Sequence, residues 1–185
     1  MNLFGKPKGK KYHTRTTEIS TYEYDEQRFV VEGCLADHRW QEFHLETGEK
    51  RRPGIFHHMI IHWLVNKQTL LIEDLDVTMP AVPDDGCLEI IGSIEPVKGL
   101  SVARGFTSKV KALGGNGKGC THIIELLISM AGSAVQGYVA YRQHESLMSK
   151  TDIMNMCENT CWTWRSDGPV VSLLKEKIKE ETDGH

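Results

Sequence analysis

A glycine-rich loop that leads into a long apolar pattern is the feature that most constrains how this chain can fold. Four of the six residues from Gly114 to Gly119 are glycine, so the backbone there can take positive φ angles and approach a partner closely. After the loop, apolar residues recur at steps of three and four with no proline among them, which predicts an amphipathic helix that begins near Cys120. The apolar positions are Ile123, Leu126, Leu127, Met130, Ala131, Ala134, Val135 and Tyr138.

Cys120 and His122 stand together at the expected start of this helix. Helix N-termini carry unpaired amide groups and the positive end of the helix dipole, and both favour a thiolate over a thiol. The pair is therefore a candidate thiol or metal site, in which His122 shares a ligand or a proton with Cys120. The alternative is that Cys120 only packs as a small apolar residue while His122 caps the helix or faces water.

The same loop does not have the spacing of a nucleotide-binding phosphate loop. That pattern needs a glycine five positions before the Gly-Lys pair and a Ser or Thr after the lysine. Around Gly117-Lys118 this chain has Ala112 and Gly119 at those positions. The loop is therefore not expected to bind phosphate in that way.

Composition indicates a globular protein of about one domain, since 185 residues suffice for a sizeable core. A formal charge of −3 with 25% charged residues gives no global basic field, which argues against nucleic acid as a partner. We predict a basic arm over residues 1–11, a single α+β domain over 12–174 with its core at about 55–142, and a charged tail over 175–185. The charged ends contain Lys6, Lys8, Lys10, Lys11 and Arg15, and Glu176, Glu180, Glu181 and Asp183.

Neither a membrane segment nor a secretory signal is expected. No apolar run reaches the roughly 20 residues that cross a bilayer, and the N-terminal residues lack a signal-peptide core. We therefore predict a cytoplasmic protein with no membrane partner. The five cysteines, an odd number at irregular spacing, favour reduced thiols over a disulfide framework.

Alternating apolar residues predict an antiparallel sheet in the first half of the chain. Short β-like runs with a turn at Asp25-Glu26 fill residues 12–45, and a polar break covers residues 46–54. Two further strands are expected on either side of a turn at Asn66-Lys67-Gln68, and another between Met79 and Ile94. The two strands flanking the turn cover residues 57–65 and 70–77.

A helix is expected from Pro96 through Leu113, before the long helix that begins at Cys120. Its apolar face contains Leu100, Ala103, Phe106, Val110 and Leu113. The fold class is therefore α+β, with an antiparallel sheet packed against two or more helices.

Three separated segments offer metal-binding side chains, and they would converge if the sheet packs on the helices. Cysteine, histidine and carboxylate together suit zinc or an iron–sulfur cluster far better than calcium or magnesium. In the alternative, the histidines are ordinary strand residues, the loop cysteine is in the core and the Asp-Asp-Gly is a turn. The side chains concerned are His57, His58, Asp84, Asp85, Cys87, Cys120 and His122.

Several blocks resemble the bacterial family called domain of unknown function 2889. The resemblance covers about residues 12 to 174, and the family has no settled activity, so it implies a fold neighbourhood and no reaction. The family has His-Asp-Met where this chain has His57-His58-Met59, so that any role of an acid there passes to His58 or is lost. The blocks are Gly54–Met59, Leu71–Leu75, Pro83–Cys87, Gly99-Leu100, Gly105-Phe106, Leu113–Leu127 and the closing Cys161-x6-Gly168-Pro169-Val170-Val171.

A more distant likeness is to NifU-type iron–sulfur scaffolds, which hold zinc or a cluster with three cysteines and a neighbouring acid or histidine. By order along the chain, the resemblance implies that the first cysteine falls near His57, the second on Cys87 and the third on Cys120. Loss of the first cysteine would weaken cluster assembly, while a zinc site with Cys2His2-like ligands would survive.

Cys157 and Cys161 would place both sulfurs on one face if their segment is helical. They could join the central site or form a redox pair, but their spacing is not the CxxC of thioredoxin-like chemistry, and packing is the simplest role for Cys157. Only Cys161 matches the family motif. Trp162 and Trp164 alternate like strand residues, and residues 175–179 resemble a short charged helix.

Three functional classes follow. The first is metal binding, of zinc or an iron–sulfur cluster, as a scaffold, a sensor or a catalytic site. The second is a thiol enzyme with Cys120 as nucleophile, His122 or His57 as its base and the glycine loop amides around an oxyanion. The third is a non-catalytic interaction domain, and a small-molecule or protein partner and a homo-oligomer fit all three. The candidate metal ligands are His57, His58, Cys87, Cys120, His122 and Cys161.

Overall fold

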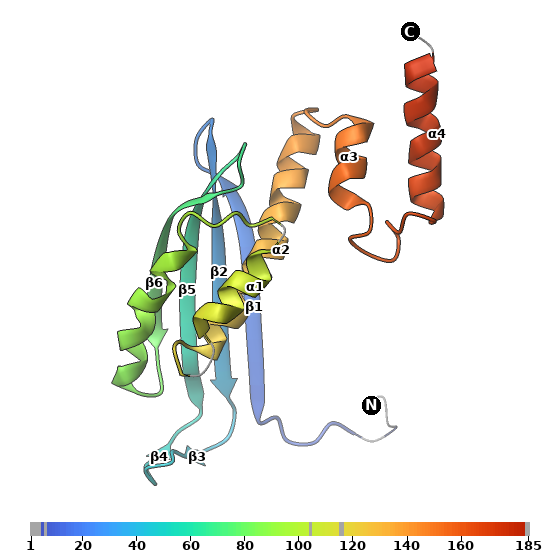
Figure 1. Cartoon of the computed structure of the whole chain (residues 1–185). Helices are drawn as coiled ribbons and strands as arrows, with labels where there is room; N and C mark the ends of the chain where they lie inside the picture. Colours follow the sequence, from blue (N-terminus) through green and yellow to red (C-terminus); the bar gives the residue numbers. More distant parts are fainter. Residues whose placement is uncertain (1–4, 6, 104, 115–116, 184–185) are drawn as a thin grey trace. The chain divides into compact units, whose positions relative to one another are not determined.

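The computed structural model describes residues 5, 7–103, 105–114 and 117–183. The chain divides into two compact units, residues 1–138 and residues 139–185. The first contains all the strands and most of the long helix, and the second contains the end of that helix and two further helices (Figure 1).

The first unit is built on a four-stranded antiparallel sheet of β1 (His13–Glu23), β2 (Arg28–Arg39), β5 (Gly54–Asn66) and β6 (Ile72–Ala81). The strands lie side by side in the order β1-β2-β5-β6. Two short strands, β3 (Phe43–His44) and β4 (Lys50–Arg51), pair with each other at one end of the sheet (Figure 1). The antiparallel sheet predicted from alternation is confirmed.

Side-chain oxygens close both turns that the sequence predicts. Asp25 Oδ1 accepts hydrogen bonds from the backbone N–H groups of Gln27 and Arg28, at 2.9 and 2.8 Å. Asn66 Oδ1 accepts from the N–H groups of Gln68 and Thr69, at 2.9 and 3.1 Å. Asp and Asn favour turns because they satisfy the local backbone in this way.

The segment after β6 differs from the prediction. Residues Asp85–Val97 form a 3₁₀ helix, η1, where a further strand was expected, and Pro96 lies inside this helix rather than opening the next one. Asp84 caps its start, because its side chain accepts a hydrogen bond from the Gly86 N–H at 2.8 Å.

The next helix is shorter than predicted. α1 spans only Phe106–Gly114, where the pattern indicated a start at Pro96. Gly99 and Gly105 take φ angles of +81° and +91°, in the left-handed region that ends a right-handed helix. α2 (Thr121–His144) begins directly after Cys120, as predicted.

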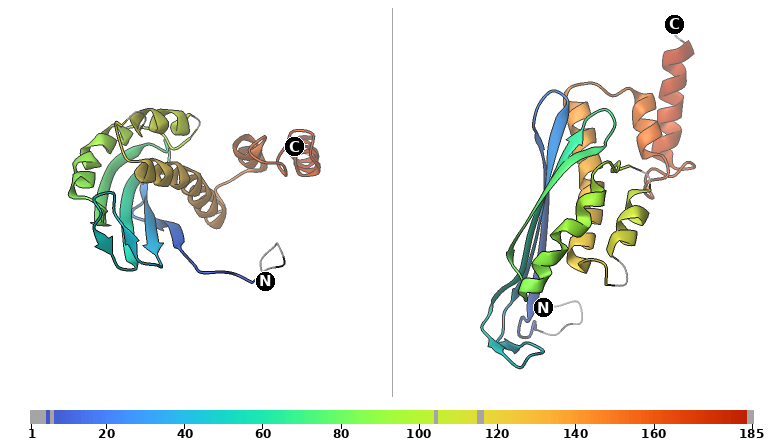
Figure 2. Two further views of the ribbon diagram at one scale, coloured as in Figure 1. Left: turned by 90° about the horizontal axis from the view of Figure 1, so that it is seen from below. Right: turned by 60° about the vertical axis from the view of Figure 1, so that its left-hand side comes forward.

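The core of the first unit lies between one face of the sheet and the helices. Figure 2 shows η1, α1 and α2 over the same face. Trp63 of β5 contacts Phe106 of α1 edge to face, with ring centroids 5.4 Å apart, and Gly33 of β2 lies directly under Met130 of α2. The fully buried side chains include Val31, Leu35, Met59, Ile61, Trp63, Val65, Ile123, Leu126, Leu127 and Met130.

α2 also meets the length and composition criterion for a membrane span, which differs from the prediction that no segment does. The core helix of a soluble protein passes the same test. In α2, the side chains of Ile123, Leu126, Leu127 and Met130 have no exposed surface and form part of the core.

Two glycines of α2 allow a matched test of how closely this helix packs. A Cβ atom at Gly137 would lie 2.5 Å from Thr21 Cβ on β1, whereas one at Gly132 would meet nothing within 4 Å. We expect Gly137→Ala to destabilise the protein by about 1–3 kcal/mol, because Thr21 is β-branched and fixed to the strand. We expect Gly132→Ala to stabilise it by about 0.5–1 kcal/mol through helix propensity.

Urea unfolding of the two variants checks this pair of effects. Changes in the free energy of unfolding that have opposite signs at the two positions support the close contact between α2 and β1. Equal stabilisation by both substitutions would contradict it.

The second unit consists of the last turns of α2, α3 (Lys150–Cys157) and α4 (Pro169–Asp183). Ser149 caps α3 with a capping box, in which its side chain and that of Asp152 bond each other's backbone N–H groups. α3 ends at Cys157, so Cys161 lies beyond the helix and not on a shared helical face. The segment around Trp162 and Trp164 forms turns rather than the expected strand, and Trp162 is 79% exposed.

Candidate metal centre

Three neighbouring strands place ionisable side chains in one row across the inner face of the sheet. In the strand register, Arg15 of β1 is opposite Asp37 of β2, and Asp37 is opposite His57 of β5. Directly opposed residues on neighbouring strands point to the same face and lie within contact distance. β2 alternates buried and half-buried positions, and Asp37 continues the buried series of Phe29, Val31, Gly33 and Leu35.

Asp37 is the centre of the row, with only 4% of its side chain exposed. Arg15 donates two hydrogen bonds to its carboxylate, from Nε to Oδ1 and from Nη2 to Oδ2, both at 2.8 Å. His13 Nε2 lies 2.9 Å from Oδ1, and His57 Nδ1 lies 3.0 Å from Oδ2. Arg15 also pairs with Glu125 of α2 at 2.5 Å, which ties the row to the helix.

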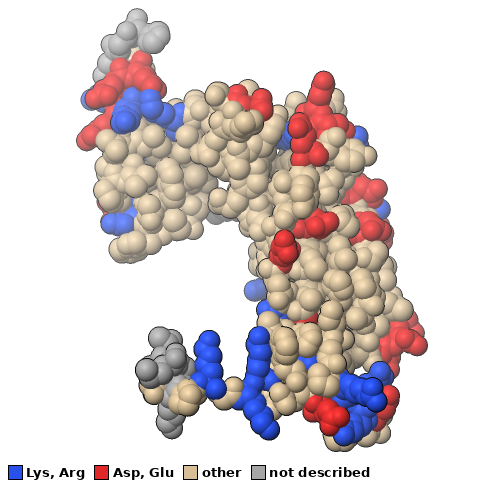
Figure 3. Space-filling view, turned by 180° about the vertical axis from the view of Figure 1, so that it is seen from behind, with Lys and Arg blue, Asp and Glu red and all other residues tan. Residues whose placement is uncertain are grey.

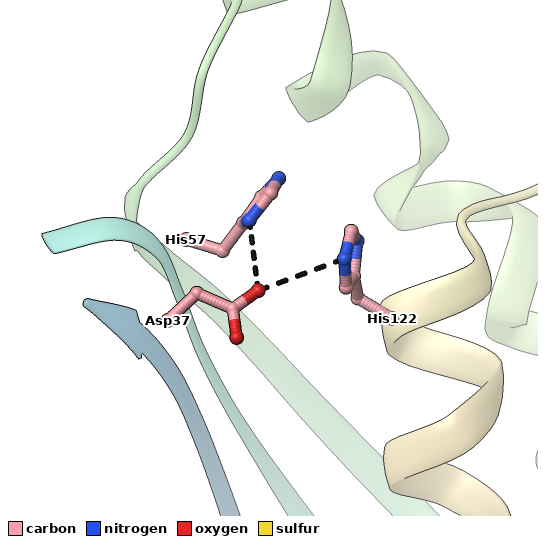
Figure 4. A group of neighbouring side chains, drawn as sticks. All are labelled: Asp37, His57 and His122. Atoms are coloured by element: carbon pink, nitrogen blue, oxygen red, sulfur yellow. Dashed lines mark hydrogen bonds and ion pairs between the residues drawn. The ribbon is translucent and has the colours of Figure 1, made fainter. Parts of the chain in front are cut away.

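His122 completes the group from the first turn of α2. Its Nε2 atom lies 3.7 Å from Asp37 Oδ2, and its ring lies 4.1 Å from the ring of His57 between centroids. Figure 4 shows the two imidazoles on either side of the same carboxylate oxygen. Ligand atoms of Asp37, His57 and His122 all lie within 4.8 Å of one another, and this is the one such metal-competent group among the described residues.

The surroundings hold all three groups in the protonation state that binds metals. The hydrogen bonds from Arg15 hold the pKa of Asp37 well below its ordinary value, despite burial. Burial lowers the pKa of His57, and the neighbouring His122 lowers it further. Burial also lowers the pKa of His122, with a contribution from the Arg15 charge. At neutral pH the site therefore presents an ionised carboxylate and two neutral imidazoles.

The distances suit a tetrahedral ion. Bonds of about 2.0–2.1 Å place the ligand atoms of a tetrahedral zinc about 3.3–3.4 Å apart. The separations of 3.0 and 3.7 Å from Asp37 Oδ2 lie on either side of that value. The ligand atoms of the two histidines lie within 4.8 Å of each other, so side-chain movement would be needed to bring all three ligands onto one ion.

Cys120 lies beside this group and not within it. It immediately precedes α2, where its carbonyl accepts the Ile124 N–H at 3.1 Å, and its Sγ atom lies 3.6 Å from His122 Nδ1. The predicted Cys120/His122 pairing therefore exists. The residue that completes the metal-competent group is nevertheless a carboxylate, and the expectation of a Cys/His ligand set is corrected to Asp/His.

In the described part of the loop, Gly114 allows close packing and Gly117 allows a left-handed backbone conformation. A Cβ atom at Gly114 would lie 2.3 Å from Ile124 Cγ1 on the first turn of α2, and Gly117 has a φ angle of +76°. The predicted oxyanion site involves Gly115 and Asn116 as well, which lie outside the described residues.

The remaining predicted ligands lie elsewhere. His58 alternates to the opposite face of the sheet from His57, where its Nε2 atom is 3.4 Å from Cys34 Sγ. Cys87 lies in η1 and is not part of the metal-competent group, and Asp84 caps that helix as the turn interpretation expected. Cys161 is exposed in the 139–185 unit, and its role as a ligand stays a prediction.

Asp37 and Arg15 were missed by the sequence analysis. Arg15 was assigned to the basic end of the chain, but it lies within β1 and pairs with Asp37. The available signal was the alternation of β2, in which an aspartate occupies a position that the pattern assigns to the core. A carboxylate there requires a buried partner.

The fold and the site together define an α+β protein with an Asp/His/His group at the junction of its sheet and long helix. The chain belongs to the family described as protein of unknown function DUF2889, whose model matches residues 13–136. This range includes all the strands and all three residues of the group. No match was found among curated proteins or solved structures, so the likeness to NifU-type scaffolds has no support from these comparisons.

Proposed function

We propose that the protein binds one divalent metal ion, zinc, through Asp37, His57 and His122. The observation that carries this proposal is that Asp37 Oδ2 lies 3.0 Å from His57 Nδ1 and 3.7 Å from His122 Nε2. Zinc takes nitrogen and carboxylate ligands, whereas calcium and magnesium prefer oxygen alone. An iron–sulfur cluster requires thiolates, and the metal-competent group contains none.

Metal binding requires deprotonated ligands, and the protein already provides them. The neutral imidazole of His57 would exchange its hydrogen bond to Asp37 for a bond to the ion, with its proton at Nε2. Asp37 Oδ2 has lone pairs for both Arg15 and the ion. Arg15 and His13 would hold the carboxylate in place from the far side.

Cys120 supports the proposal as an orienting group. Ligating histidines usually donate their second ring N–H to a neighbouring acceptor, which fixes the tautomer. Cys120 Sγ lies 3.6 Å from Nδ1 of His122, so it is placed to accept that bond while Nε2 faces the ion. With three protein ligands, a fourth position stays open to water or substrate, as in catalytic zinc sites.

The second candidate is a thiol enzyme. It is favoured by the Cys120–His122 contact at the start of α2, in which His122 would act as the base. In this case Cys120 carries the chemistry and zinc is absent from the active protein.

Zinc titration of chelator-treated protein tests the proposal. We expect one equivalent to bind, as measured by competition with a chromophoric chelator, and cobalt(II) to give the absorption spectrum of a tetrahedral site. Cys120→Ser should weaken binding about tenfold, because it alters an orienting group and not a ligand. Cys87→Ser should leave the affinity unchanged.

Other outcomes would separate the alternatives. Complete loss of metal in both cysteine variants would restore the Cys/His site expected from the sequence. Wild-type protein that binds neither zinc nor cobalt, together with selective alkylation of Cys120 by an electrophilic probe, would favour the thiol enzyme.

A further inference from the structure

A cavity lies at the end of the sheet where β3 and β4 pair. Its volume is about 280 Å³, and it is lined by residues of β3, β4 and β5 and of the segment after β6. Phe43, Phe56 and Val82 give it an apolar wall, and Arg51 and Arg52 give it positive charge. This volume is just below the usual range of about 300–1,000 Å³ for small-molecule sites, so only a small ligand would fit.

The positive charge around this cavity is only partly neutralised. Arg51 pairs with Glu49 at 3.2 Å, whereas Arg52 has no ion-pair partner among the described residues. Arg39 lies over the rings of Phe43 and Phe56, at 5.6 and 5.3 Å from their centroids, and also has no carboxylate partner in that part of the chain. Figure 3 shows lysine and arginine side chains at this end of the molecule, with acidic side chains among them.

We propose that this cavity binds a small organic carboxylate. Arginine presents a planar fork of donors that matches a carboxylate, and Arg52 is available to form this pair. The apolar body of the ligand would pack against Phe43 and Phe56, whose rings meet edge to face at 5.1 Å. Arg39, which lies over both rings, adds positive charge near the cavity.

The cavity also lies close to the proposed ion. The ring of Phe56 contacts the ring of His57 edge to face, with centroids 4.8 Å apart, so a bound carboxylate would lie one aromatic ring away from His57. Any link between the bound carboxylate and the zinc ion rests on the proposed function. The anion site itself rests only on the cavity and its arginines.

Titration of ¹⁵N-labelled, chelator-treated protein with benzoate tests the proposal by NMR. We expect amide shifts centred on Phe43, residues 51–56 other than the proline, and Val82. Binding should be about tenfold weaker in Arg52→Gln, because a charge-assisted pair is lost. Arg165→Gln is the matched control, since Arg165 lies in the other unit beside Asp167. The affinity of the Arg165→Gln protein for benzoate should equal that of the wild type.

Benzamide and inorganic phosphate define the chemistry of the site. Benzamide should bind at least about tenfold more weakly than benzoate, because it lacks the charge. Phosphate that binds as tightly as benzoate would overturn the proposal, since the apolar wall would then contribute nothing. Shifts spread over the whole surface, or an unchanged affinity in Arg52→Gln, would also overturn it.

A repeat of the titration with His57→Gln protein separates this inference from the metal proposal. Benzoate binding that persists in that variant supports the anion site whether or not zinc binds. Loss of benzoate binding only in Arg52→Gln, with zinc affinity unchanged, assigns the two ligands to two distinct sites.

Discussion

Replacing His57 by glutamine is expected to weaken zinc binding by about a hundredfold or more, since loss of even an indirect contact to a zinc ligand costs about 10–100-fold. His57 Nδ1 is a direct ligand in the proposed site, and its ring is largely buried, with 13% of the side chain exposed. Glutamine preserves a polar side chain of similar reach but removes the imidazole nitrogen. Competition with a chromophoric zinc chelator measures the change.

His58→Gln is the control, because it makes the same chemical change one residue along the same strand. His58 points to the opposite face, beside Cys34, so its zinc affinity should stay within about threefold of the wild type, the variation expected of context. Equal loss in both variants would place the metal elsewhere or indicate a general effect on folding. An unchanged affinity in His57→Gln would refute the Asp/His/His site.

Because side chains alternate between the two faces along β5, a departure from the family pattern at position 58 leaves the candidate site unchanged. The resemblance to the family implied an acidic residue at position 58, where this chain has histidine. Residue 58 faces away from Asp37 and His57, so a change there does not alter the proposed ligand set. The acid that the site uses comes from the neighbouring strand.

Much of the fold was predictable because it is encoded locally. Period-two alternation predicted β5, and the three- and four-residue spacing predicted α2 from its first turn. The prediction was wrong for Asp85–Val97, where a short apolar run is compatible with either a strand or a helix. The Asp84 cap decided between them, since its hydrogen bond to Gly86 turns the backbone.

The candidate site was only half predictable for a different reason. His57 and His122 carry imidazole groups, which are the commonest metal ligands in proteins, so the sequence could nominate them. Asp37 becomes significant only through strand register, which places it between Arg15 and His57. Register depends on pairing between segments that are far apart in the chain, and no local pattern reports it. Cys120 was nominated for its chemistry, but its position beside His122 makes it a neighbour of the group.

Asp37→Asn is expected to destabilise the metal-free protein by about 2–3 kcal/mol. Breaking a buried ion pair costs about 3–5 kcal/mol. We expect a smaller loss for Asp37→Asn because the Arg15 side chain is partly exposed, at 32%. Asparagine keeps the shape but loses the charge, so the Arg15 fork faces an amide N–H in place of one acceptor. Urea unfolding in the presence of a chelator measures the difference without any contribution from metal binding.

Glu32→Gln on the same strand is the matched control. Glu32 pairs with His62 at 2.9 Å, but its side chain is 41% exposed, and exposed pairs contribute less than about 1 kcal/mol. A loss at Glu32 equal to that at Asp37 would contradict the buried network.

The pH dependence of the stability difference between the wild type and Asp37→Asn tests whether the charge of Asp37 causes that difference. The pKa of Asp37 is depressed in the folded protein from an ordinary value of 3.8, so the unfolded chain takes up a proton first as the pH falls. The stabilisation is therefore fully present above about pH 5 and is lost progressively as the pH falls below the ordinary pKa towards the folded one. We expect the wild type and Asp37→Asn to converge in stability at low pH. A gap that stays constant down to pH 2 would show that the carboxylate stabilises the fold through packing and not through its charge.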